Sequence, residues 1–457
     1  MSSVARSPES NKHGTLLLIA AGLAQFIVTA DWWAVSVALP PMADQFHVRP
    51  IDLQWVITGY VLTFCAFLAI AGPLGDRYGR RKFLLVGIAL FAGVSIWTGL
   101  SDSAVMVIIA RISLGVGGGL LFPLATAIVS DASGKDQLGR NIAILTGIAM
   151  LGAAFGPVLG GLLTEVLSWR WIFFANVPIS AIAFLMVLFF ARESRDPTVE
   201  GRLDISGILL LMIGISLFSV GVDRIPHWVP WAWTSLLVGG VLILVVFVIV
   251  ELKISHPIID IRLFLDRRYL GYSVGGLLGN AAWCGLVIGA TLQLQVVLGY
   301  DVLDAGLFFL FLSGSVAMTS FLSPRLERRY GTAWLTGIGL MLQAAGLCLL
   351  FLTDHVPGLS LGMLIAGAGC SLAWSMPQAG AIKQLPIEKV GVASGTIMTV
   401  MVLSGNTMIV LITMIIDLYP KSVEGEAAGI RIGFLLSGAA ALMGLLLVIG
   451  ILRRRDI

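Results

Sequence analysis

The sequence predicts an all-α integral membrane protein with about fourteen transmembrane helices. Of its 457 residues, 58% are hydrophobic and 12% are charged, against about 25% charged residues in soluble domains. The apolar residues form uninterrupted runs of about 20 residues, which is the length that crosses a bilayer as a helix. Lipid satisfies no backbone polar group, and the alternating pattern of a membrane β-barrel is absent, so the runs must be helices.

Fourteen runs of this length follow one another along the chain. With an even number of spans, both chain ends lie on the same side of the membrane. If that side is cytoplasmic, its loops hold 23 Lys and Arg, the outer loops hold 5, and Arg111 lies within a span. The positive-inside rule therefore predicts a cell-membrane protein with cytoplasmic termini. The spans begin near Gly14, Leu53, Phe83, Ala104, Asn141, Ile172, Ile205, Trp231, Leu270, Leu303, Ala333, Leu359, Val392 and Ile430.

Two internal similarities indicate a duplication. Asp76-Arg-Tyr-Gly79 after the second span resembles Arg328-Arg-Tyr-Gly331 after the tenth, at an offset of 252 residues. A Gly and a Pro eight residues apart in the fourth and twelfth spans repeat at an offset of 254. Repeats of this kind are common in transporters. We expect an N-terminal tail (1–13), a six-helix bundle (14–191), a linker with two inserted helices (192–269), a second six-helix bundle (270–452) and a C-terminal tail (453–457).

Several function classes are excluded by what the chain lacks. The net charge of +3 is small, and no basic stretch interleaved with aromatic residues offers a nucleic-acid groove. The four Cys and five His show no metal-ligand spacing, so we expect no metal or cofactor. No catalytic set of nucleophile and base is apparent, and no GxxxxGK[ST] motif for nucleotide hydrolysis is present. We therefore expect no enzyme, and any work must draw on an ion gradient.

Motifs along nearly the whole chain resemble the major facilitator superfamily, in particular its fourteen-helix drug:proton antiporter branch. The loop Gly72-Pro-Leu-Gly-Asp-Arg-Tyr-Gly-Arg-Arg-Lys82 is similar to the superfamily's signature loop. Arg111-Ile-Ser-Leu-Gly-Val-Gly117 is similar to its buried-arginine motif, with Leu114 where glutamine is common. Asp31-Trp-Trp-Ala-Val-Ser-Val-Ala-Leu-Pro40 and Trp169-Arg-Trp-Ile-Phe-Phe-Ala-Asn-Val-Pro178 resemble markers of the branch, although Trp33 and Ser36 replace the usual threonine and asparagine.

Asp31 is the residue on which the functional prediction depends, because a carboxylate within a span is costly and marks a functional site by default. Counted from the helix ends at 1.5 Å per residue, Asp31 lies roughly 13 Å and Arg111 roughly 10 Å deep. The two side chains can therefore meet. Burial favours the protonated carboxyl and a nearby guanidinium favours the ionised one, so that separating the pair favours proton uptake. The alternatives are an interfacial helix cap or a structural brace.

The signature loop is too polar for lipid, so its charges must pair with neighbouring helix ends. By resemblance, Asp76 braces the helix ends that meet when the cytoplasmic side closes, and Asp131 is placed to pair with Arg80. The alternative is a basic cluster that serves only topology. The predicted latch comprises Gly72, Asp76, Arg77, Gly79, Arg80, Arg81 and Asp131.

The fifth span resembles the motif associated with antiporters. Its small residues at intervals of four let another helix approach closely, and its proline bends the helix. The alternative is ordinary small-residue packing. The predicted gate comprises Gly152, Gly156, Pro157, Gly160 and Gly161.

A substrate cavity is expected near the midplane between the two halves. Polar or aromatic residues within the spans are the candidates, although Trp often forms interfacial belts and amides often bond other helices. The candidates are Trp32, Trp33, Trp55, Tyr60, Asn280, Trp283, Gln293, Trp374, Gln378 and Asn406, of which we expect Trp33, Tyr60, Asn280, Trp283, Gln378 and Asn406 to line the cavity.

The resemblance implies a monomeric transporter that exports small amphipathic drugs or metabolites in exchange for protons, by alternating access in the lipid bilayer. The alternative is proton-coupled uptake of a small metabolite by symport, which the same architecture supports.

Overall fold

The computed structural model of the chain describes residues 8–48, 53, 55–195, 204–225, 228–254, 257, 261–383, 385, 390–420 and 422–452. The described residues form fourteen α-helices, a 3-10 turn η2 (Ile261–Leu265) and a π-helical turn η3 (Gln293–Val297). The α-helices are α1 (Pro8–Phe46), α2 (Trp55–Tyr78), α3 (Arg80–Gly99), α4 (Ala104–Ala132), α5 (Lys135–Val166), α6 (Arg170–Phe190), α7 (Ile205–Asp223), α8 (Pro230–Lys253), α9 (Arg267–Leu292), α10 (Val302–Tyr330), α11 (Thr332–Leu352), α12 (Val356–Lys383), α13 (Val390–Asp417) and α14 (Val423–Leu452).

The prediction of fourteen spans is confirmed only in part. Within the described residues, 12 helices are long and apolar enough to cross a membrane, and 13 if the bent helix α2 counts as one span. Helix α2 bends by 44° between Leu68 and Ile70, because Pro73 cannot donate a hydrogen bond to the carbonyl four residues earlier and its ring clashes there. The apolar part of α7, Ser206–Val222, is shorter than the other spans.

The helices also extend beyond the apolar runs from which they were predicted. Helix α1 begins at Pro8, inside the predicted N-terminal tail, although its apolar span does begin at Gly14. Residues 1–7 and 453–457 of the two predicted tails lie outside the described residues, as do 196–203 of the predicted linker.

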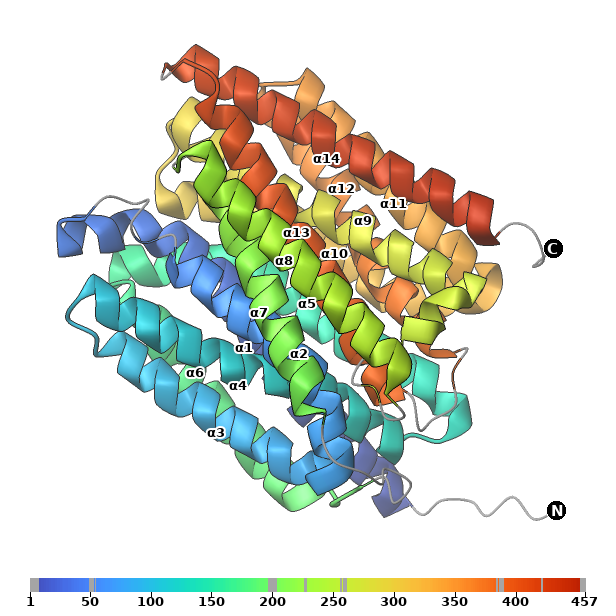
Figure 1. Cartoon of the computed structure of the whole chain (residues 1–457). Coiled ribbons are helices and arrows are strands. Elements are labelled where there is room, and N and C mark those ends of the chain that lie inside the picture. The colour runs from blue at the N-terminus through green and yellow to red at the C-terminus, as the bar shows by residue number, and fades with distance from the viewer. Residues whose placement is uncertain are drawn as a thin grey trace.

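The two predicted halves use the same helix pairings. In the first half α1 packs on α5 and α6, α2 on α4, and α3 on α4 and α6; in the second, α9 packs on α13 and α14, α10 on α12, and α11 on α12 and α14. The halves meet along two seams, α5 against α10 and α2 against α13. Helices α7 and α8 pack on each other, and α7 contacts both α2 and α13 (Figure 1). The inserted pair therefore lies across the second seam.

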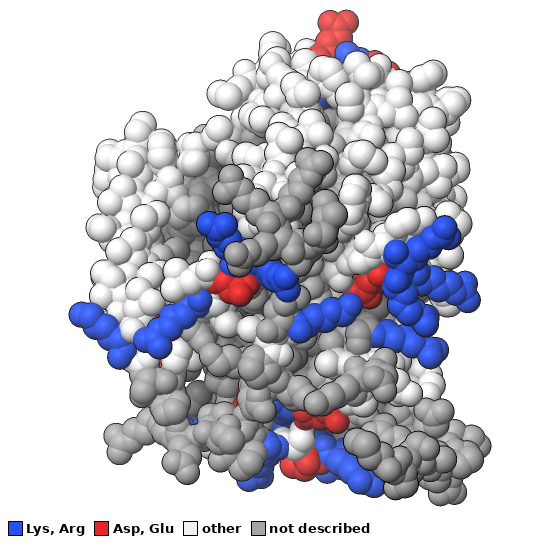
Figure 2. All heavy atoms as spheres, turned by 90° about the vertical axis from the view of Figure 1, so that its right-hand side faces the viewer, with Lys and Arg blue, Asp and Glu red and all other residues white. Residues whose placement is uncertain are grey.

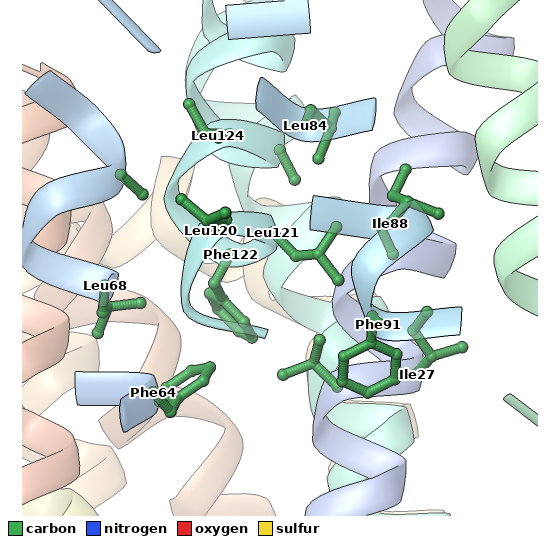
Figure 3. Close-up of a cluster of buried hydrophobic side chains, with 14 of the residues drawn as sticks. Ile27, Phe64, Leu68, Leu84, Ile88, Phe91, Leu120, Leu121, Phe122 and Leu124 are labelled. Carbon is green, nitrogen blue, oxygen red and sulfur yellow. The ribbon is translucent and has the colours of Figure 1, made fainter. Parts of the chain in front are cut away.

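The apolar core of the first half sits where α2, α3 and α4 converge beside α1 (Figure 3). Leu84, Phe91, Leu121 and Leu124 are fully buried there, and Ile27 joins them from α1. Between helices in a bilayer such packing replaces the hydrophobic effect as the main attraction, because lipid tails are as apolar as leucine. This packing fixes the positions of α1 and α4, which carry the charged site.

The surface of the described helices is apolar over most of their length, whereas charges gather at their ends. Large exposed side chains such as Phe189, Trp231, Val241 and Phe321 project outward, as expected of a surface that faces lipid. Figure 2 views the molecule from the right-hand side of Figure 1, where α1 begins and α14 ends, and several Lys and Arg side chains spread across this face. The chain is thus a multi-pass membrane protein.

Candidate functional site

The structure brings Asp31 of α1 and Arg111 of α4 together as an ion pair. An Nη1 hydrogen of Arg111 bonds Asp31 Oδ2, and both side chains are fully buried. Arg111 Nε also donates to the carbonyl oxygen of Val56 on α2, at 3.0 Å. Helix α1 continues past Asp31 to Phe46, so Asp31 lies inside the helix and not at its end.

Asn176 of α6 completes the contacts of the carboxylate. Its Nδ2 donates to Asp31 Oδ1 at 2.9 Å and lies 3.4 Å from Ser95 Oγ on α3. Asn176 is itself buried, so five helices, α1, α2, α3, α4 and α6, meet through this one polar cluster. The sequence analysis missed Asn176, although it lies in the quoted motif Trp169–Pro178 at the start of the sixth span; an amide within a span was the signal that pointed to it.

The face of the guanidinium is covered by aromatic rings. Arg111 Cζ lies 4.2 Å from the centroid of the Tyr60 ring and 5.8 Å from that of Phe173. Cation–π attraction is strong where water is excluded, so these rings help to hold a buried cation. Tyr60 was predicted to line the substrate cavity; the structure places it instead beneath Arg111.

The predicted latch residues Asp76, Arg80 and Asp131 meet where α2 and α4 end and α3 begins. Arg80 Nε donates to Asp76 Oδ1 at 2.7 Å, and Arg80 Nη1 bonds Asp131 Oδ1. The side chain of Asp76 is 3% exposed. Ser194, which follows α6, adds a hydrogen bond from its Oγ to Asp131 Oδ2 at 2.6 Å.

Glu193 holds the start of α3 beside these residues. Its carboxylate accepts from the backbone N–H of Arg81 at 3.1 Å and of Lys82 at 3.2 Å, where the free amides at a helix N-terminus favour an anion. Gly79 has φ 119°, and a Cβ there would lie 2.7 Å from Glu193 Oε1. The sequence analysis missed Glu193 because no local pattern reveals that α6 ends beside α3.

Three further latch residues have contacts of other kinds. Gly72 is buried within α2, Arg77 Cζ lies 5.3 Å from the centroid of the neighbouring Tyr78 ring, and the Arg81 side chain donates to the Leu188 carbonyl at 2.6 Å. In the second half the corresponding turn has Gly331 at φ 81°.

The predicted gate residues lie against α1. A Cβ on Gly156 would lie 2.8 Å from the Ala30 carbonyl oxygen, and one on Gly160 would lie within 2.9 Å of three backbone atoms of Ala34. Gly152 faces the Phe26 carbonyl oxygen in the same way. The glycines at intervals of four therefore allow α5 to touch the backbone of the helix that carries Asp31. Pro157 faces α10, where its carbonyl oxygen would lie 3.4 Å from a Cβ on Gly306, and Gly161 is buried.

A central pocket lies between the two halves, and three of the six predicted cavity residues line it: Trp33, Asn280 and Trp283. The Trp33 ring on α1 meets the Trp283 ring on α9 edge to face, with centroids 6.1 Å apart. The pocket volume of about 30 Å³ is far below the roughly 300–1,000 Å³ of small-molecule sites. The pocket is lined by Val28, Thr29, Trp32, Trp33, Phe64, Phe122, Met150, Ala153, Asn280, Trp283, Cys284, Trp374, Met398 and Val402.

The other predicted cavity residues, Tyr60, Gln378 and Asn406, do not line this pocket. Gln378 Nε2 donates to the Trp374 carbonyl at 3.3 Å, and Asn406 is buried. Asn280 itself donates to the Met401 carbonyl at 2.6 Å, so its amide also binds α9 to α13. Among the described residues, no group of three or more His, Cys, Asp or Glu is arranged to hold a metal ion.

Comparison with known proteins shows the family to which the chain belongs. Residues 21–407 match the family profile described as Major Facilitator Superfamily. The chain belongs to the major facilitator superfamily. As a member it is a membrane transporter and not an enzyme.

Its relatives include named export proteins. It is 33% identical over 403 residues to the multidrug resistance protein Stp of Mycobacterium tuberculosis (strain CDC 1551 / Oshkosh), an alignment covering 84% of this chain and 72% of the relative. It is 29% identical over 417 residues to the tetracenomycin C resistance and export protein of Streptomyces glaucescens, covering 89% and 77%. The crystal structure of the human organic anion transporter MFSD10 (TETRAN) superposes with a TM-score of 0.67 at 16% identity, covering 97% of this chain and 100% of that one, which shows the shared fold.

The close contact between α1 and α5 predicts that Gly160→Ala destabilises the protein. The new methyl group collides with backbone atoms of Ala34, and overpacking of this kind costs about 1–3 kcal/mol. Gly93→Ala on α3 is the matched control, because a Cβ there meets nothing within 4 Å. We expect a lower apparent melting temperature in detergent for Gly160→Ala and an unchanged or higher one for Gly93→Ala; equal values would contradict the close contact.

The ion pairs of the latch predict that Arg80→Gln destabilises the chain by about 3 kcal/mol, since it removes one partner of a buried ion pair. The other partner, Asp76, is almost fully buried. Lys82→Gln removes a neighbouring positive charge but keeps the backbone N–H that bonds Glu193. Denaturant titration of both variants in matched micelles should show the loss in Arg80→Gln alone.

Proposed function

We propose that this chain exports small amphipathic molecules in exchange for protons, as a fourteen-span member of the drug:proton antiporter branch, monomeric and with both termini in the cytoplasm. The observation that carries the proposal is the buried ion pair of Asp31 and Arg111 beside Asn176. An ionisable residue within a span marks a functional site by default, and proton relays are one of the functions that such residues serve. The export direction is supported by relatives that are named as resistance and export proteins.

The coupling follows from the place of Asp31 on α1. The proposed coupling step is the exchange of the contacts that Arg111 and Asn176 make with Asp31 for a proton. The next residues on the same helix, Trp32 and Trp33, line the central pocket. A substrate that enters must therefore push against the same turn of α1 that holds Asp31, which links proton uptake to substrate movement.

The structure corresponds to an occluded arrangement in this cycle. The Trp33 and Trp283 rings meet across the pocket and leave space for little more than one water molecule. A drug-sized molecule requires the two halves to move apart at one end, which is the rocking motion of alternating access. In this scheme the cluster of Asp76, Arg80 and Asp131 stabilises the helix ends on the cytoplasmic side, and the glycines of α5 let α1 slide.

The decisive variant is Asp31→Asn, which keeps the shape of the side chain and removes the titrating group. We expect transport driven by a pH gradient to be abolished in proteoliposomes, while exchange of labelled for unlabelled substrate, which needs no proton movement, persists. The substrate is a dye selected in a pump-deficient host. It is one that the host accumulates less when this chain is expressed.

Asp102→Asn is the matched control, because the Asp102 side chain is 95% exposed and lies 3.8 Å from Arg170. It should leave both activities unchanged. Undiminished gradient-driven transport by Asp31→Asn would refute the proposal, and dye accumulation that rises with expression would indicate uptake instead.

Asn176→Leu tests the hydrogen bond between α6 and the Asp31 carboxylate. The variant removes the amide that donates to Asp31 Oδ1. A hydrogen bond to a charged group is worth about 1.5–3 kcal/mol. We expect denaturant titration in detergent to show a loss of stability of about this size, together with slower transport driven by a pH gradient.

Ser95→Ala is the control for this loss, since it keeps the bond between Asn176 and Asp31 and removes only the contact at 3.4 Å. Equal stability and equal gradient-driven transport in Asn176→Leu, Ser95→Ala and the unmodified chain would show that the hydrogen bond to Asp31 does not hold this site together.

A further inference from the structure

The seam between α5 and α10 is closed at one end and open at the other. Towards the end where Gly306 lies, a Cβ on Gly306 would be 3.3 Å from Val158 Cα, so the two backbones nearly touch. Towards the opposite end the helices diverge around a groove of about 630 Å³. A Cβ on Gly147 would lie 3.3 Å from Ser320 Cβ, and this contact forms the floor of the groove.

The walls of the groove are apolar. Ile148 and Leu151 of α5 face Ala317 and Phe321 of α10 across it. The Phe321 side chain is 84% exposed, on a helix long and apolar enough to span the membrane. A groove of this depth and chemistry accepts a hydrocarbon chain from the surrounding bilayer.

The rim of the groove is basic. Arg140 of α5 and Arg325 and Arg328 of α10 line it, and in the described part of the chain none of the three forms a salt bridge with a carboxylate. Arg328 Nε reaches the Pro324 carbonyl at 3.4 Å. The nearest acidic residue in sequence, Glu327, is engaged elsewhere, with Lys383 and with Thr332 Oγ1.

We propose that this groove binds an anionic phospholipid from the leaflet at this end of the molecule, with an acyl chain between α5 and α10 and the phosphate on the three arginines. Guanidinium groups pair with phosphate oxygens in bidentate geometry and remain charged at every physiological pH. Long basic side chains near the end of a span reach the headgroup layer naturally. The apolar walls favour a lipid over a free anion.

Such a lipid bridges the two halves. Arg140 belongs to the first half and the other two arginines to the second, so closing the groove gathers three positive charges in a confined space. An anionic headgroup offsets this repulsion, and an acyl chain keeps the helices apart. The bound lipid therefore stabilises the arrangement in which α5 and α10 are open at this end, independently of any proton movement.

Native mass spectrometry of the purified chain tests the site. The protein is titrated with phosphatidylglycerol and, separately, with phosphatidylcholine of the same acyl chains. Arg325→Gln/Arg328→Gln is compared with Arg267→Gln/Arg329→Gln, which removes two exposed arginines at the same end outside the groove. Each basic residue near an anionic headgroup contributes roughly fivefold in affinity, so the groove variant should bind phosphatidylglycerol at least about tenfold more weakly, and the control variant as the unmodified chain does.

Two further arms identify the ligand. Ala317→Trp fills the groove and leaves all three arginines, so it should also weaken phosphatidylglycerol binding; inorganic phosphate should not displace the lipid. Equal binding of both lipids, equal losses in the two arginine variants, unchanged binding by Ala317→Trp, or displacement by inorganic phosphate would each overturn the proposal. These measurements need no transport, so they stand apart from the test of Asp31.

Discussion

The structure of this transporter depends on one buried ion pair. Two charges out of water are costly unless they are paired and hydrogen-bonded, and three further helices contribute polar groups to the cluster around Asp31 and Arg111, although Arg111 Nη2 has no hydrogen-bond partner among the described residues. Val56 supplies a carbonyl from α2, Asn176 an amide from α6, and Ser95 a hydroxyl from α3. The arrangement of five of the first six helices is thus tied to this one ion pair. Separating the pair changes what these five helices gain from being together.

The packing around the pair explains how that change can reach the pocket. Helix α5 lies so close to α1 that glycine is required where the helices cross, and Thr29 Oγ1 of α1 donates to the Ala149 carbonyl of α5 at 2.7 Å. Close backbone contact with few side-chain obstacles lets one helix slide over another at small cost. The large, interlocked side chains in the core instead hold α2, α3 and α4 together as a rigid body.

The sequence identified residues that stand out because of the surrounding lipid alone. It missed residues whose role depends on which helices they contact. Asp31 and Arg111 stand out in any apolar run, because a charged side chain within a span is costly whatever its partners are. Asn176 and Glu193 act only through helices distant in sequence, which no periodicity reveals. For the same reason Tyr60 was predicted to line the cavity, although its ring lies against the Arg111 guanidinium. Phe64 and Phe122 were not predicted, although both line the pocket. Helix α7 was predicted as a span from its hydropathy, yet its apolar part, Ser206–Val222, is shorter than the other spans.

The inserted helices make the two seams between the halves unequal. Helix α7 lies against both α2 and α13, and the Arg224 guanidinium carbon at its end lies 5.4 Å from the centroid of the Trp55 ring on α2. One flank of the molecule is thereby shielded from the bilayer, and the other, between α5 and α10, is left bare. The two flanks of this pseudo-symmetric protein therefore differ: a hydrocarbon chain in the bilayer can reach the seam between α5 and α10 directly, whereas α7 covers the seam between α2 and α13.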